Sequence, residues 1–190
     1  MNRNSANKHN LLVLVAILLL VAICASIYLW FYPMTQAREE SYDAVLLFSD
    51  GREPVPCTVR IAGDYGTYYF KNRRSFFRGQ MFVDGISVCD AFSMTYDKGQ
   101  QYAEFTHEGS GCTAVLGLEL GEIYAEVFYD TAAGSVLDSS AAETGERCLL
   151  VAPVQDGVSA AQQLSNLLNG ADFPTEWEAL AARWQPYASQ

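Results

Sequence analysis

The sequence predicts a mainly β fold: a single N-terminal transmembrane helix, followed by an antiparallel β-sandwich or open β-barrel domain with two short C-terminal helices. Three observations predict it. Residues 11–32 form one uncharged apolar run, the middle of the chain is a succession of short alternating segments between turn residues, and two amphipathic segments follow residue 158. Alternation with a period of two is typical of half-buried strands, and their close succession favours a sandwich or barrel over a βαβ arrangement.

The apolar run LLVLVAILLLVAICASIYLWFY, residues 11–32, is long enough to cross a membrane. As a helix it would measure roughly 33 Å, against about 30 Å for a hydrocarbon core. Its fourteen Leu, Ile, Val and Phe side chains favour burial in lipid by roughly 4 to 8 kcal/mol in total. Pro33 follows and ends the helix. Membrane lipid is therefore an expected partner, through residues 11–32.

The charges that flank the run predict its orientation. Arg3 and Lys8 precede it, whereas Arg38 after it is followed at once by two glutamates. Because basic residues concentrate on the cytoplasmic side of a span, we expect the N-terminus in the cytoplasm and the C-terminal domain outside the cell membrane. The chain then divides into a cytoplasmic tail 1–10, a transmembrane helix 11–32, a juxtamembrane linker 33–41 and an exterior β-rich domain 42–190.

One processing alternative stays open at this level. Thr35, Gln36 and Ala37 place small residues where a signal peptidase reads them, so cleavage after Ala37 would release a secreted soluble domain. The apolar run is longer than the 7 to 15 residues usual for a signal peptide, which favours an anchored protein.

The predicted exterior domain is strongly acidic. Beyond residue 37 the chain has ten basic and twenty-two acidic residues, a net charge of −12. Such a domain repels polyanions as a whole, so we expect no nucleic acid among its partners.

The strands are predicted from alternation and turn residues. Segments 43–48 and 55–61 predict a first hairpin, residues 63–66 a turn, and 77–83 the next strand. A hairpin turning at residues 98–99 would pair Phe92 with Phe105 and Met94 with Ala103. A further hairpin turning at Gly121, in a type II′ turn, would set Ala114 opposite Tyr129 and leave Glu119 and Glu126 in solvent.

The last third of the chain predicts a loop, a strand and two helices. Residues 131–146 are small, polar and aperiodic, which indicates a flexible loop. Residues 148–152 are a fully apolar strand. Two capping boxes, starting at Ser159 and Thr175, predict the C-terminal helices within residues 159–185.

Cys57, Cys89, Cys112 and Cys148 fall in the predicted exterior domain. Four cysteines in an oxidising compartment permit two disulfides by any of three connectivities. The spacings contain no CxxC pair, and the acidic residues of the chain have no EF-hand spacing, so no metal site and no cofactor are expected.

Catalytic chemistry has little support in the sequence, and no catalytic residue is assigned. Cys112 and His107 could form a thiol-dependent site with Asp90, which the predicted hairpin sets opposite His107. Cys112, however, falls on the apolar alternation of its strand, which indicates a buried and unreactive thiol. An anchored thiol-dependent enzyme therefore remains the alternative function.

The most unusual segment mixes aromatic and basic residues, from Tyr68 to Arg78. Four of the ten basic residues beyond residue 37 lie here, between residues 71 and 78, next to five aromatic residues. Such a cluster can bind an anionic partner, with the rings adding stacking contacts. A solvated turn between two core strands would also explain it. The candidate binding residues are Tyr68, Tyr69, Lys71, Arg73, Arg74 and Arg78.

The sequence thus predicts a membrane-anchored extracytoplasmic binding or assembly module of the cell envelope. Its expected partner is an envelope protein or an anionic envelope polymer, and the candidate site is the cluster between residues 68 and 78.

Overall fold

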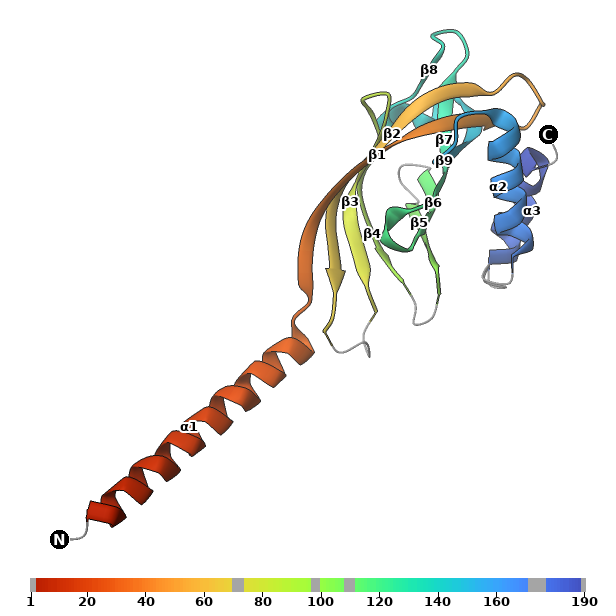
Figure 1. The fold of residues 1–190 in the computed structure, drawn as a ribbon. Helices are drawn as coiled ribbons and strands as arrows, with labels where there is room; N and C mark the ends of the chain where they lie inside the picture. Colours follow the sequence, from red (N-terminus) through yellow and green to blue (C-terminus); the bar gives the residue numbers. More distant parts are fainter. Residues whose placement is uncertain (1–2, 70–73, 97–99, 108–111, 171–176, 189–190) are drawn as a thin grey trace.

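The computed structural model describes residues 3–69, 74–96, 100–107, 112–170 and 177–188. Helix α1 (Arg3–Phe31) leads away from a domain of strands and helices (Figure 1). Its segment Leu11–Phe31 has a mean hydropathy of 3.0 and none of it is buried against the rest of the chain. One helix of the described chain is therefore long and apolar enough to cross a membrane.

The strands form one nearly closed antiparallel sheet, which confirms the predicted fold class. Along the sheet their order is β4, β3, β2, β1, β9, β7, β6, β5, and β8 pairs with β7. The strands are β1 (Met34–Phe48), β2 (Val55–Thr67), β3 (Phe76–Val83), β4 (Ile86–Thr95), β5 (Tyr102–His107), β6 (Cys112–Gly117), β7 (Ile123–Asp130), β8 (Ser135–Val136) and β9 (Glu146–Ala152).

The sheet has an apolar core on each face. Its inner face is filled by side chains from strands all around the barrel, and its outer face along β1, β6, β7 and β9 packs against two helices. Strand β9 shows both: Cys148 and Leu150 point into the barrel, while Leu149 and Val151 point towards the helices. Burial on both faces explains why residues 148–152 are apolar without interruption.

The helices are α2 (Gly157–Asn169) and α3 (Glu178–Ala188), which pack against each other (Figure 1). The sequence places the start of α2 at Ser159. The cap is Asp156 instead, whose carboxylate accepts a hydrogen bond from the backbone N–H of Ser159 at 2.8 Å. The second predicted cap, Thr175, lies outside the described residues.

The predicted linker, residues 33–41, belongs almost entirely to β1. Met34 pairs with Thr67, and the β1–β2 ladder runs without a break from there to Leu46. The polar side chains of this half of β1 gave no apolar alternation to detect. Backbone hydrogen bonds to β2 order it instead.

Two further differences concern turns. Residues 131–146, predicted as one loop, contain β8 and the 3₁₀ turn η2 (Ser139–Thr144). In the hairpin β6–β7, Ala114 pairs with Ala125 and not with the predicted Tyr129, a register shift of four positions. The shift arises because residues 118–120 form the 3₁₀ turn η1 (Leu118–Leu120) and do not continue the strand. Gly121 has φ −67°, so the turn is not type II′. The shift is an even number of residues, so the inner face of β6 is the predicted one.

Strands β4 and β5, predicted as a hairpin, lie at opposite ends of the sheet path. The sheet curves so that the two strands nevertheless lie side by side. The ring centroids of Phe92 and Phe105 are 5.1 Å apart, so the two side chains predicted to be partners are in contact, without the predicted ladder. At the seam, where the described residues of β4 and β5 lie side by side, the barrel is therefore held together by side-chain contacts in place of a backbone ladder.

The predicted turn at residues 63–66 lies inside β2. Gly63 pairs with Gly79 of β3, and the two backbones approach so closely that a Cβ on Gly63 would lie 2.5 Å from Cα of Gly79 and nearer still to the carbonyl oxygen of Arg78. These glycines let the strands touch where a side chain would separate them.

We expect Gly63→Ala to lower the free energy of unfolding by about 1–3 kcal/mol, since the new methyl group must push β3 away. Chemical denaturation of the full chain in detergent, followed by circular dichroism, measures this. The matched control is Gly121→Ala, where φ is −67° and the new Cβ would lie 3.7 Å from its nearest neighbour. Equal stability of the two variants would contradict the close approach.

Candidate functional site

Three of the predicted binding residues, Tyr68, Arg74 and Arg78, line one groove of about 450 Å³. Lys71 and Arg73 lie outside the described residues, and Tyr69 is 62 % exposed beside the groove. The structure adds residues from two strands that the sequence did not bring to this site. The groove is lined by Tyr68, Arg74, Phe76, Arg78, Ser93 and Thr95.

The floor of the groove is the outer face of the β3–β4 pair. Arg78 pairs with Ser93, and Phe76 with Thr95, so a guanidinium and two hydroxyls face outwards together. The Arg78 guanidinium lies 5.0 Å from the centre of the Phe76 ring. A ring under a guanidinium orients it while its N–H donors stay available to a ligand. The groove therefore offers planar cationic donors, hydroxyls and aromatic edges.

The groove lies at the end of the sheet from which α1 departs. Helix α1 ends at Phe31, β1 begins three residues later, and Met34 pairs with Thr67, the residue before Tyr68 (Figure 1). Arg78 pairs with Asp64, three residues further along β2, which is about 10 Å at the usual rise of a strand. This connectivity holds the groove close to the end of the apolar helix.

Of the residues in the alternative thiol site, the structure describes the side chains of Cys112 and Asp90. Cys112 is 2 % exposed, and a hydrogen bond with the Cys89 thiol together with burial raises the pKa of Cys112, which opposes thiolate formation. Asp90 accepts hydrogen bonds from the hydroxyls of Ser87 and Ser139. The side chain of His107 is not among those described.

Glu126, predicted to face solvent, is 2 % exposed. Helix α3 covers it. Its carboxylate accepts a hydrogen bond from Trp184 Nε1 at 2.8 Å and forms an ion pair with Arg183, whose Nε lies 3.1 Å away. The prediction was wrong because a strand pattern does not reveal that a helix packs on the outer face. The carboxylate is satisfied by the protein and has a structural role.

A second polar hollow, about 180 Å³, lies between the sheet and α2. Glu122 is its centre and accepts hydrogen bonds from Tyr102 and Tyr124 at 2.7 and 3.1 Å. Burial, and next the charge of Glu122, raise the pKa of Tyr124, so this tyrosine stays a neutral donor. The two tyrosine hydroxyls and the Glu122 carboxylate are thus hydrogen-bonded to one another within the protein.

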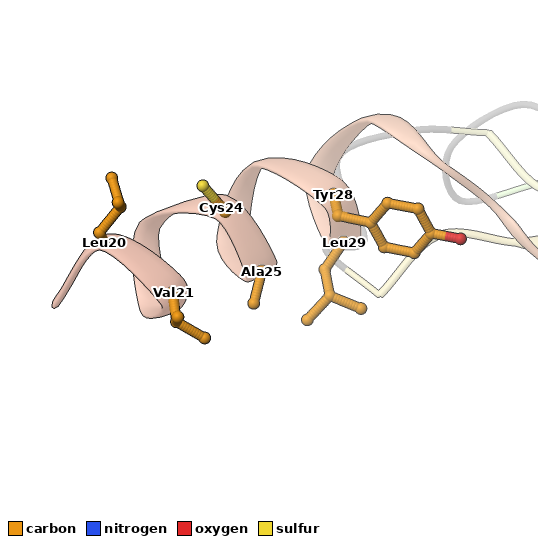
Figure 2. A pocket seen from close by; sticks show the side chains of 6 residues that line it. All are labelled: Leu20, Val21, Cys24, Ala25, Tyr28 and Leu29. Atoms are coloured by element: carbon orange, nitrogen blue, oxygen red, sulfur yellow. The ribbon is translucent and has the colours of Figure 1, made fainter. Parts of the chain in front are cut away.

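A further hollow lies on the side of α1, where small Cys24 and Ala25 sit between larger residues (Figure 2). Its lining is almost entirely apolar and it is open along the helix. In a membrane such a surface meets lipid chains or another helix, so it offers no polar chemistry. Among the side chains that the structure describes, no group of three or more His, Cys, Asp and Glu residues is placed to hold a metal ion.

Comparisons with models of protein families, with curated proteins and with solved structures give no match to this chain.

Proposed function

We propose that this chain is a membrane-anchored binding module outside the cell membrane, and that its groove binds the phosphate groups of an anionic envelope polymer. One observation carries the proposal: Arg74 and Arg78 line the same groove as Tyr68, Phe76 and two hydroxyls, near the end of the apolar helix. Guanidinium groups match phosphate oxygens in pairs, and hydroxyls and rings suit the sugar or polyol units between phosphates.

The shape of the site favours an extended polymer over a flat lipid surface. The groove follows the paired strands from Phe76 to Arg78, away from the end of β3 nearest α1. A domain with net charge −12 beyond residue 37 is repelled by an anionic bilayer. A single extended chain can lie in the groove and avoid most of that repulsion, which is screened within about 8 Å at physiological salt.

The position of β1 supports the anchored form over a secreted domain. Cleavage after Ala37 would remove Met34 to Ala37, which pair with Thr67 to Asp64 of β2. The end of β2 beside the groove would then lose its pairing with β1.

We expect the double variant Arg74→Gln/Arg78→Gln to bind long-chain inorganic polyphosphate about 30- to 1,000-fold more weakly than the wild type, since each of the two charge-assisted contacts contributes about 1–2 kcal/mol. The full chain in phosphatidylcholine nanodiscs, titrated with labelled polyphosphate at several salt concentrations, measures this.

The matched control is Arg60→Gln/Arg147→Gln, which changes the net charge equally. Both control arginines are exposed and lie over phenylalanine rings, as Arg78 does. Equal losses in the two double variants would refute a specific groove. If the groove arginines are needed for binding to phosphatidylglycerol vesicles while polyphosphate does not bind, the ligand is a lipid headgroup and the polymer is excluded.

A further inference from the structure

The cysteines Cys89 and Cys112 face each other inside the barrel. Cys89 lies on β4 and is 1 % exposed, and Cys112 begins β6 and is 2 % exposed. Both belong to the apolar cluster of the inner face, and their thiols hydrogen-bond to each other. The two thiols are thus close together in the core, although they lie on strands that are not neighbours in the sheet.

A β-bulge in β4 turns Cys89 inwards. Gly79 of β3 pairs with Phe92, and Met81 pairs with Cys89, so two steps along β3 correspond to three along β4. Asp90 and Ala91 are consecutively exposed as a result, and Cys89 and Phe92 both point into the core. Without the extra residue, Cys89 and Phe92, three positions apart, would lie on opposite faces.

The pair lies at the seam between β4 and β5. Cys112 pairs with His107, the last residue of β5, and β5 is the strand that comes side by side with β4 without a ladder. Further along the same seam Phe92 meets Phe105. A bond between the two sulfur atoms would join β4 to β6 across the end of β5, where the described residues of β4 and β5 form no backbone ladder.

The remaining exterior cysteines have other surroundings. The Cys148 thiol donates a hydrogen bond to the carbonyl oxygen of Val127 at 3.5 Å. Cys57 lies near the start of β2 and is only partly buried. Of the six pairs that four cysteines can form, the structure therefore singles out Cys89 with Cys112.

We propose that Cys89 and Cys112 form a disulfide that closes the barrel seam when the domain folds in an oxidising compartment. The oxidant is a disulfide donor such as oxidised glutathione. The Cys89 thiolate attacks one donor sulfur and releases the reduced thiol of the donor. Cys112, after losing its proton, then attacks Cys89 of this mixed disulfide and releases the second donor thiol. Two protein thiols are oxidised, and one donor disulfide is reduced to two thiols.

The closed barrel shields both thiols, so we expect exchange while the seam is open during folding. The bond is formed from residues of this chain alone and does not depend on the proposed ligand.

The test uses the full chain with Cys24→Ala, which removes the exposed thiol of the helix. The protein is unfolded in urea with reductant, refolded in detergent with a mixture of reduced and oxidised glutathione, alkylated under denaturing conditions, and mapped by mass spectrometry. We expect a peptide linked through Cys89 and Cys112, with Cys57 and Cys148 alkylated. Alkylation of both Cys89 and Cys112, or their linkage to Cys57 or Cys148, would overturn the proposal. Since folding takes place in vitro, the result is independent of membrane orientation.

Thermal unfolding provides a second measurement. Adding reductant to the oxidised protein should lower its Tm by about 5 to 10 °C, as expected for a disulfide that closes the chain between Cys89 and Cys112 into a loop. Cys89→Ala should remove this dependence on reductant, and the matched control Cys57→Ala should keep it. The opposite pattern would assign the bond to another pair.

Discussion

Replacing Trp184 with alanine is expected to lower the free energy of unfolding by about 3–5 kcal/mol. Trp184 has no exposed surface, and its ring lies in the outer-face core that joins α3 to the sheet. Its Nε1–H also donates to Glu126 at 2.8 Å. The substitution opens a cavity and removes a donor from a buried carboxylate, so α3 should detach from the outer face.

Two variants separate packing from hydrogen bonding at this position. Trp184→Phe keeps most of the ring but not the donor, and Glu126 then retains the Arg183 contact at 3.1 Å, so we expect a loss of about 1–3 kcal/mol. The exposed neighbour Gln185→Ala is the control and should change stability by less than about 0.5 kcal/mol. Urea unfolding of the full chain in detergent, followed by circular dichroism, gives all three values. A Trp184→Ala variant as stable as the control would mean that α3 does not dock here.

Replacing Leu20 with arginine is expected to release much of the protein from the membrane. Leu20 is 62 % exposed near the middle of the apolar helix, so the change removes little packing within the chain. On the insertion scale, exchanging leucine for arginine at the centre of a span costs about 3–4 kcal/mol, a large share of the roughly 4 to 8 kcal/mol that favour insertion. Carbonate extraction of cell membranes, followed by a C-terminal tag, measures the retained fraction.

The control is Asn10→Arg, which adds the same charge just before the apolar run and should stay in the membrane. Protease treatment of intact cells then tests orientation, because an exterior domain loses its tag. If Leu20→Arg and the wild type are extracted equally by carbonate, the helix does not anchor the chain. A tag protected in intact cells would reverse the predicted orientation.

Local sequence patterns determined the elements of this protein that depend on one stretch of chain. The apolar helix follows from residues 11–32, and most strands follow from alternation, because the side chains of a strand point to opposite faces whatever strand lies next to it. Even the wrong register predicted for β6 and β7 kept Ala114 on the inner face, since an even shift preserves the face.

Partners across the sheet were decided by the tertiary structure. The polar start of β1 carries no apolar pattern, and only its ladder with β2 makes it a strand. The face of Glu126 depends on whether α3 covers it, and the inward turn of Cys89 depends on a bulge against β3. Each of these depends on contacts between distant segments, which periodicity within one segment does not encode.

The candidate site shows the same division. The basic and aromatic cluster follows from local sequence alone, because Tyr68, Arg74 and Arg78 lie close together along the chain. Only the folded sheet brought Ser93 and Thr95 of β4 to the same groove, and only the pairing of Met34 with Thr67 placed that groove near the apolar helix. Composition selects the chemistry of a surface, whereas strand pairing decides which side chains share it, because pairing joins residues that are remote in sequence.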